Sequence, residues 1–452
     1  MSIRRPVALC LATAVAASTA AACSSSKSSS PSAGSGPKVT LTVAEWTNPG
    51  AVEFTKQLNA QFEKAHPNVK VDFQSTATAN GAWGQLTTSL LQAKSVDVLA
   101  QFAPTQKAFP PDFTNIKPAG AAALVEANQL TDLKDQPFMK NYDAAAQEAA
   151  VGYKGGVYGV MAAEYSAAGA LWYKKDLLAK YNITPPTTFQ EFLDDCAKLK
   201  AAGKTPIFLA GKVGMQGGIW QGIENQTLMS GKQPDASTQV SSDRATAFWN
   251  GTQNWNDQAY KDIGAKYQQV MKYIEPAASG VDQQTAPGIW AVKTDDYPFL
   301  LDGSWDGATI QKANPKLNLG FFVMPGTDNT ADNRVPVKPD LTWVVPTSAP
   351  HKDLAMEWLA MFSQPENYKA WLKATGSMST QPAVSNTDTP WMDWLNQHSS
   401  DSFVQLTTPW VPAGAPNDAG SPDFYKLAPI GSDSLDTILS RSASAYSKSI
   451  GK

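Results

Sequence analysis

Histidine and cysteine are the side chains that most often hold metal ions, and the chain has only three of each. His66, His351 and His398 are far apart in the sequence, and no two stand four residues apart as paired ligands on a helix would. The tripeptide GKT at 203–205 matches the end of a phosphate-binding loop, but Lys198 stands where that loop needs its first glycine. We therefore expect no metal site, no cofactor and no catalytic residue.

Paired carboxylates are a second route to chemistry, because a glycosidase needs only two of them about 5 to 9.5 Å apart. Four aspartates are close in sequence to Trp305, and they are Asp295, Asp296, Asp302 and Asp306. The same residues also fit a solvated loop followed by a turn. A chain with 40 acidic residues has such groups by chance. A glycosidase is therefore kept as an alternative interpretation.

Aromatic side chains, by contrast, are abundant, with 14 Trp, 13 Tyr and 17 Phe. Some tryptophans adjoin glycine or polar residues where strands are expected to end: Trp46, Trp220, Trp305 and Trp343. A sugar ring offers one apolar C–H face and a rim of hydroxyl groups, which suits an exposed indole with polar neighbours. Others occupy strand or helix-stripe positions and are assigned to the core: Trp172, Trp358 and Trp371. The first group favours a ligand-binding cleft.

Length and charge limit the class of protein further. The chain of 452 residues is long enough for about three domains, or for two large ones. Its 37 basic and 40 acidic residues give a formal net charge of -3. Because this balance includes no basic excess to neutralise phosphate groups, we expect no nucleic-acid partner.

The first 37 residues are expected to direct export. Two arginines, at positions 4 and 5, precede an apolar stretch that is too short for a membrane-spanning helix. Small residues lead up to Cys23, and a stretch rich in Ser, Gly and Pro follows it. This order resembles a bacterial lipoprotein signal, which implies removal of residues 1–22, lipidation of Cys23 and a flexible tether over 23–37. An ordinary secretory signal cut near Ala22 is the alternative.

Strand and helix patterns alternate through the rest of the chain. Apolar residues predict strands at 39–46, 69–73, 96–100, 171–173 and 207–209. Apolar residues at helical spacing separate these strands, and the start of one such helix is marked by a capping box, Thr188 with Glu191. This order predicts an α/β fold with parallel strands and right-handed crossovers. Cys196 lies on an apolar helix stripe, so we expect it to be a buried thiol.

Five stretches of sequence, in order over about residues 38–385, carry a family resemblance: VTLTVAEWTNPG (39–50), VYGVMAAEY (157–165), PPTTFQEFLDDC (185–196), FLLDGSWDG (299–307) and TSAPHKDLAMEWLAMF (347–362). Together they resemble the carbohydrate-binding, family 1 type of extracellular solute-binding protein of ABC importers. The resemblance implies a periplasmic-binding-protein-like fold, in which two α/β lobes are joined by a hinge and hold the ligand between them. The implied boundaries are 38–162 for the first lobe, 163–339 for the second, 340–395 for a return to the first, and 396–452 for a segment that closes on the second.

The same resemblance, matched position by position, implies ligand contacts at strand ends and crossovers. These are Trp46, Asn48, Gln101, Phe102, Glu164, Tyr165, Trp220, Glu224, Trp305, Asp306, Asp340 and Trp343. Trp305 is the aromatic of the GSW motif, the position that relatives most often stack on sugar. Glu164 and Tyr165 belong to the first crossover, which implies both hinge and ligand contact. Lys174 departs from the pattern, because relatives favour asparagine there, and we assign it no role.

A function in transport follows from the resemblance. The protein would be the substrate-binding component of an ABC sugar importer, capturing a mono- or oligosaccharide by hinge closure and delivering it to a membrane permease. It would act as a monomer without enzymatic activity, held at the outer face of the cytoplasmic membrane by its lipid anchor alone. Two alternatives stay open, a cell-attached secreted glycosidase and a binding protein for a non-sugar solute.

Overall fold

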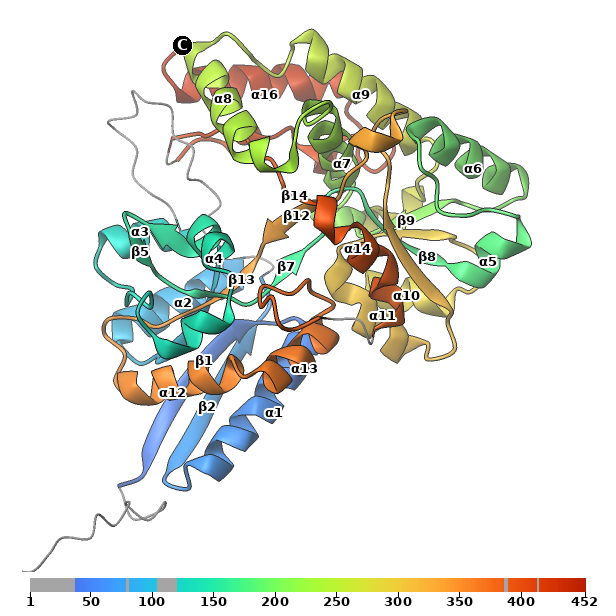
Figure 1. Ribbon diagram of the computed structural model, residues 1–452. Coiled ribbons are helices and arrows are strands. Elements are labelled where there is room, and N and C mark those ends of the chain that lie inside the picture. The colour runs from blue at the N-terminus through green and yellow to red at the C-terminus, as the bar shows by residue number, and fades with distance from the viewer. Residues whose placement is uncertain (1–36, 79–80, 104–119, 386–388, 413) are drawn as a thin grey trace, which may run out of the picture.

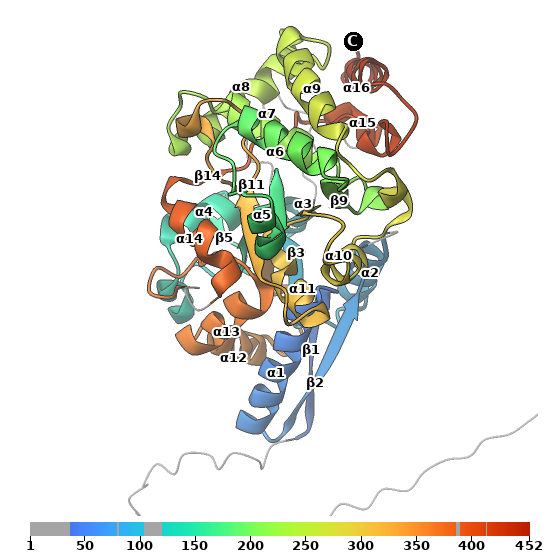
Figure 2. The ribbon, with the colours of Figure 1, turned by 90° about the vertical axis from the view of Figure 1, so that its right-hand side faces the viewer.

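Two lobes, each with its own sheet and its own apolar core, make up the computed structural model (Figures 1 and 2). The structure describes residues 37–78, 81–103, 120–385, 389–412 and 414–452. The expected signal peptide, Cys23 and the tether up to residue 36 lie outside the described residues. The predicted two-lobed α/β fold is confirmed. In the described part of the chain, every helix is too short or too polar to span a bilayer.

The first lobe is organised around a five-stranded sheet with the strand order β2-β1-β3-β13-β6. Its strands are β1 (Val39–Trp46), β2 (Val69–Thr76), β3 (Val98–Phe102), β6 (Val160–Met161) and β13 (Leu341–Val344). Its other elements are α1 (Pro49–Ala65), α2 (Ala82–Ala93), α3 (Gly120–Glu126), α4 (Ala144–Val151), α12 (Lys352–Phe362), α13 (Pro365–Thr375) and the hairpin of β4 (Gly152–Tyr153) and β5 (Gly156–Val157). Because β1 and β3 run parallel, their carboxyl ends meet at one edge of the sheet.

Local sequence explains where α1 begins. The Asn48 side chain accepts hydrogen bonds from the backbone N–H groups of Gly50 and Ala51, at 3.1 and 3.3 Å. Pro49 takes the first helical position, where its fixed φ is suited to a helix and its missing N–H costs nothing. The buried face of the helix, which includes Phe62, packs into the core of the first lobe. The helix therefore starts directly behind the carboxyl end of β1.

The second lobe is organised around a four-stranded sheet with the order β11-β8-β10-β9. Its strands are β8 (Ala170–Lys174), β9 (Ile207–Leu209), β10 (Phe299–Leu301) and β11 (Leu319–Val323). Its helices are α5 (Lys175–Lys180), α6 (Phe189–Ala201), α7 (Gly217–Leu228), α8 (Ser237–Asn250), α9 (Gln258–Met271), α10 (Ala286–Val292), α11 (Gly307–Ala313), α14 (Asp393–His398), α15 (Asn417–Gly420) and α16 (Leu435–Ser449). β8 is antiparallel to both of its neighbours, whereas β10 is parallel to β9.

Helix α6 confirms two expectations from the sequence. The capping box is formed, with the Thr188 side chain accepting from the Glu191 N–H at 3.2 Å and the Glu191 carboxylate accepting from the Thr188 N–H at 3.2 Å. Cys196 is fully buried on the apolar face of the helix and is a free thiol. A side chain without access to water is protected from oxidation and exchange, so Cys196 fills space in the core.

Short strands connect the lobes. β7 (Glu164–Tyr165) and β12 (Pro336–Pro339) pair antiparallel in a three-stranded sheet that β14 (Phe403–Val404) completes, and Figure 1 shows this sheet between the two lobes. A further passage follows α13, where the Met378 N–H donates to the carbonyl of residue 164 at 2.8 Å. Met392 already belongs to the core of the second lobe, so the boundary expected at residue 395 falls inside α14.

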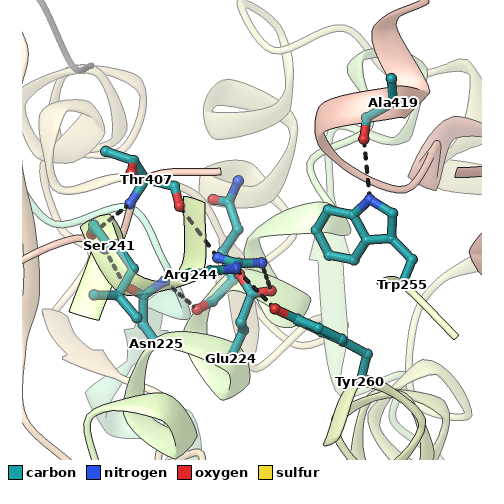
Figure 3. Close-up of polar contacts among 10 residues, drawn as sticks. Glu224, Asn225, Ser241, Arg244, Trp255, Tyr260, Thr407 and Ala419 are labelled. Atoms are coloured by element: carbon teal, nitrogen blue, oxygen red, sulfur yellow. Dashed lines mark hydrogen bonds and ion pairs between the residues drawn. The ribbon is translucent and has the colours of Figure 1, made fainter. Parts of the chain in front are cut away.

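The C-terminal segment is attached to the second lobe by a buried polar network (Figure 3). Arg244 of α8 pairs with Glu224 of α7 at 2.5 Å, and both side chains are about 95% buried. The Arg244 Nε donates to the Tyr260 hydroxyl at 2.9 Å, and its Nη1 donates to the Thr407 carbonyl at 3.3 Å. One guanidinium group thus joins α7, α8, α9 and the chain after β14.

Candidate ligand-binding cleft

A cavity of about 260 Å³ lies between the two lobes. The first lobe lines it with Trp46, Thr47, Asn48, Pro49, Ala51, Thr78 and Phe102. The second lobe lines it with Gln283, Gln284, Trp305, Asp306 and Thr309. The chain at and after the crossovers adds Tyr165, Lys338, Asp340 and Leu341. Seven of the residues expected to contact ligand therefore line one cavity: Trp46, Asn48, Phe102, Tyr165, Trp305, Asp306 and Asp340.

Trp46 and Phe102 form an aromatic surface on the wall of the first lobe. They end β1 and β3, the neighbouring parallel strands, and their rings stack with centroids 4.2 Å apart and planes inclined by 18°. Trp83 of α2 supports Trp46 edge-on at 5.9 Å. Trp46 is buried, whereas Phe102 is 45% exposed. The exposed ring is therefore available to a ligand.

Trp305 forms a second aromatic surface of the cavity, in the turn between β10 and α11. A Cβ at Gly303 would lie 2.2 Å from Cζ3 of Trp305, so this glycine lets the indole fold against the backbone. The Gly303 carbonyl accepts from the Trp172 indole N–H at 2.9 Å, which anchors the turn to the core. Tyr165 of β7 packs against Trp305 in a T-shaped arrangement, with centroids 5.6 Å apart. The indole is therefore held from behind and faces the cavity.

The turn that carries Trp305 is also joined directly to the crossover. The Ser304 N–H donates to the Ser166 carbonyl at 2.9 Å. The Ser166 N–H in turn donates to the Ser304 hydroxyl at 3.2 Å. These reciprocal bonds tie the second wall of the cavity to the strand that enters the second lobe.

Polar groups surround the space between the two aromatic surfaces. On β12, Lys338 Nζ lies 2.9 Å from Oδ1 of Asp340, so this lysine is already paired. Gln283, before α10, and Thr309, in α11, add an amide and a hydroxyl from the second lobe. Such groups donate and accept hydrogen bonds, which is what the hydroxyl rim of a sugar requires.

Asp302 and Asp306, on either side of Trp305, form a buried pair of carboxyl groups. Asp302 is fully buried, and the Gly303 N–H donates to its Oδ1 at 2.8 Å. Burial raises the pKa of Asp306 to about 6. Burial, together with the charge of Asp306, raises the pKa of Asp302 well above its usual range. Of the two carboxyl groups, Asp302 therefore keeps a proton more readily, and Asp306 ionises first.

Two further buried carboxyl groups adjoin cleft residues. Glu45 precedes Trp46 on β1, and Glu164 precedes Tyr165 on β7. The Thr55 hydroxyl donates to the Glu45 carboxylate at 3.1 Å, which lowers the pKa of Glu45. Burial has the larger effect and raises this pKa to about 8. Burial also raises the pKa of Glu164 to about 7. These acids make the stability of the fold depend on pH.

We expect the free energy of unfolding to fall as the pH rises from 5 to 9, and Glu45→Gln to remove part of this fall. An acid with a higher pKa in the folded state binds its proton more tightly there, so stability is lost as the pH rises from 4.5 to about 8. By urea unfolding, the difference between pH 5 and pH 9 should shrink by about 2–4 kcal/mol in the variant. The exposed Glu366→Gln should leave it unchanged. If Glu45→Gln shows the same difference in the free energy of unfolding between pH 5 and pH 9 as the wild type, the folded protein does not raise the pKa of Glu45.

Three expected ligand contacts are wrong, because Trp220, Glu224 and Trp343 are buried inside the lobes. Trp220 lies on α7 and packs against Phe424 with centroids 5.6 Å apart, because the glycines before it begin a helix and do not expose the ring. Glu224, one turn further, forms the ion pair that holds the C-terminal segment. Trp343 lies on β13 and packs edge-on against Trp358 at 5.1 Å in the core of the first lobe.

Two other expected contacts lie beside the cavity without lining it. Gln101 precedes Phe102 on β3, and its carbonyl accepts from the Thr342 hydroxyl at 2.9 Å. Glu164 lies on the crossover, where its carboxyl group is buried and its carbonyl binds the passage after α13. Both residues therefore support the cleft from behind.

A second cavity, of about 390 Å³, lies within the second lobe, and of the four aspartates grouped near Trp305 in the sequence it is lined by only one. Asp295 lines it, together with Lys174. The Lys174 ammonium group donates to the Lys293 carbonyl at 2.5 Å and lies 4.6 Å from the centroid of Trp290. No aromatic residue is among its described lining. Asp295 thus lines this second cavity, whereas Asp306 lines the cleft and Asp302 is fully buried, so the grouped aspartates do not form one carboxylate site.

Several residues of the cleft were not found from the sequence. Thr309 stands three residues after Asp306 on α11, so helical spacing from the GSW motif could have indicated it. Lys338 lies near the end of β12, two residues before Asp340, so the spacing from Asp340 could have indicated it. Gln283 and Gln284 lie in the loop before α10, where no pattern in the sequence marks them.

Two α/β lobes, crossed by short strands and enclosing an aromatic and polar cavity, define a class of solute-binding protein. The sequence matches the family described as bacterial extracellular solute-binding protein over residues 47–369. This match covers more than half of the chain, and the protein belongs to that family.

Individual relatives are more distant. An uncharacterized ABC transporter extracellular-binding protein of Pyrococcus horikoshii is 25% identical over 359 residues, which cover 76% of this chain and 73% of that protein. A chitin oligosaccharide binding protein has a TM-score of 0.68 at 16% identity, covering 92% of this chain and 100% of that one. A Bacillus licheniformis sugar transporter in complex with stachyose has a TM-score of 0.64 at 18% identity, covering 90% of this chain and 99% of that one. RafE in complex with raffinose has a TM-score of 0.61 at 17% identity, covering 81% of this chain and 90% of that one. These likenesses confirm the fold.

Proposed function

We propose that this protein is the substrate-binding component of an ABC importer for a mono- or oligosaccharide. The observation that carries the proposal is the pair of aromatic surfaces, Phe102 on Trp46 and Trp305 on Tyr165, that line one cavity together with polar residues. Such walls suit the C–H faces of sugar rings, and the rim suits their hydroxyl groups. The similar structures named for raffinose, stachyose and chitin oligosaccharide support the same class of ligand.

Capture works by closure of the lobes on the solute. The crossovers β7 and β12 are short strands that can change their backbone angles while each lobe keeps its own core. A solute that touches both walls stabilises the closed arrangement by the contacts that it makes only there. The closed protein then delivers the solute to a permease in the membrane.

The protein works outside the cell, at the outer face of the cytoplasmic membrane. Removal of residues 1–22 leaves Cys23 at the new N-terminus, where a lipid holds the protein to the bilayer as a monomer. Residues 23–37 are rich in Ser, Gly and Pro, the composition of a tether between such an anchor and the lobes. Metabolic labelling with a radioactive fatty acid tests this anchor, and Cys23→Ala should abolish the labelling.

Calorimetry against a panel of mono- and oligosaccharides tests the proposal, and at least one sugar should bind saturably at a single site. Amino acids, polyamines and phosphate esters form the comparison panel. If one of these binds and no sugar does, the protein serves a non-sugar solute. Release of reducing ends from an oligosaccharide would instead identify the protein as a glycosidase. Binding of a sugar that is not cleaved contradicts that alternative.

A further inference from the structure

The ionisable side chains that line the cleft have a negative balance. Lys338 and Asp340 neutralise each other at 2.9 Å, which leaves Asp306 as the unpaired charge. With the described residues, neither Asp306 nor Asp302 forms an ion pair. The groups that interact with the two carboxyl groups are each other, the Gly303 N–H, Trp305 and Thr309, and none of these is a cation.

The two carboxyl groups of the pair differ in their access to the cavity. Asp302 is 0% exposed and lies outside the lining, whereas Asp306 is 7% exposed and belongs to it. Two buried carboxyl groups close together cannot both be ionised without a cation, so one of them keeps a proton. The more buried Asp302 then has a hydrogen to donate to Asp306. Asp306 keeps its charge and its remaining lone pairs for a ligand.

We propose that the Asp302–Asp306 pair selects uncharged glycosides and excludes anionic ones, such as uronic acids and sugar phosphates, from this cleft. The inference rests on the proposed function and specifies its substrate class. Hydroxyl groups of a neutral sugar donate to the Asp306 carboxylate, which forms stronger hydrogen bonds than a neutral acceptor. An anionic sugar meets a fixed negative charge there without a free lysine or arginine in the described lining. Asp302 acts through Asp306 as a positioning residue.

Matched pairs of ligands test the selectivity. The panel sugar that binds most tightly is compared with the same sugar oxidised to a carboxylate at its primary hydroxyl, beginning with galactose against galacturonate and galactobiose against digalacturonate. At pH 7.5 the neutral member should bind at least about 100-fold more tightly to the wild type. At pH 5, where Asp306 takes up a proton, this ratio should fall below about tenfold.

Variants assign the effect to the pair. Asp306→Asn should weaken the neutral sugar about tenfold, reduce the selectivity ratio to the same extent as low pH does, and remove the dependence of that ratio on pH. Asp302→Ala should also weaken binding, and Asp302→Asn, which keeps a donor beside Asp306, should recover most of the loss. Asp262→Asn, an exposed aspartate on α9, is the matched control. Thermal unfolding of each variant shows whether it is folded.

Each unfavourable result has a separate meaning. Equal binding of the neutral and oxidised sugars by the wild type overturns the selectivity and leaves the proposed function intact. A selectivity ratio that is unchanged in folded Asp306→Asn overturns the role of the pair. If only the oxidised sugar binds, the assignment of charge in the cleft is wrong. If neither binds and no other sugar does, the proposed function fails and the inference fails with it.

Discussion

Replacing Trp305 with alanine is expected to weaken sugar binding by about 30- to 1,000-fold while the protein stays folded. The indole provides one of the two aromatic walls of the cavity, and aromatic contacts at the centre of a site commonly contribute about 2–4 kcal/mol. Trp305 is only partly buried and packs at the border of the first lobe's core, against Tyr165, so the protein should stay folded without it. The dissociation constant for the panel sugar that binds best, measured by calorimetry, checks this.

Two comparisons make the Trp305 result specific. Trp305→Phe keeps a flat ring and should retain most of the affinity. Trp394→Ala removes a partly exposed indole that stacks on His398 away from the cleft, and it should bind sugar like the wild type. A wild-type dissociation constant for Trp305→Ala would place Trp305 outside the binding site.

Arg244→Ala is expected to lower the free energy of unfolding by about 3–5 kcal/mol. The substitution leaves the Glu224 carboxylate buried without its cation, and it also removes the donor to the Thr407 carbonyl. Aromatic rings surround the guanidinium, with Trp255 at 5.4 Å, so neither packing nor water replaces it readily. Urea unfolding measures the change, and hydrogen exchange should show the greatest loss of protection in the chain after β14.

An exposed ion pair and a double variant are the controls for Arg244. Lys70, 77% exposed, pairs with Glu63 at 2.9 Å, and Lys70→Ala should cost less than about 1 kcal/mol. Arg244→Met combined with Glu224→Leu removes both charges and should be more stable than Arg244→Ala alone. A cost below about 1 kcal/mol for Arg244→Ala would show that Glu224 finds another partner or a proton.

The sequence predicts the elements of the cleft better than the direction of individual side chains. Trp46 and Phe102 could be placed because they end neighbouring parallel strands, and such ends meet at one edge. Trp305 could be placed because the GSW turn is short and follows a buried strand. In these cases the position of the residue on its element is enough to bring it to the cleft.

Trp220 and Trp343 show where prediction from sequence ends. Glycine next to an aromatic fits an open loop, but in α7 it allows close packing: a Cβ at Gly222 would lie 2.7 Å from the Cα of Gly169. β13 is buried on both faces, so alternation does not tell a cleft residue from a core residue there. Glu224 could not be assigned because its partner, Arg244, lies on another helix. Such contacts depend on how elements pack together.

The reciprocal bonds between Ser166 and Ser304 make the Trp305 turn mechanically part of the crossover. In the proposed closure, a rotation about β7 would therefore move the Trp305 turn together with the crossover. A sugar ring stacked on Trp305 would then influence the angle at which the lobes close. Sugars that stack on Trp305 equally well but at different angles would then stabilise different degrees of closure. The permease would therefore meet a different angle between the two lobes for each of these sugars.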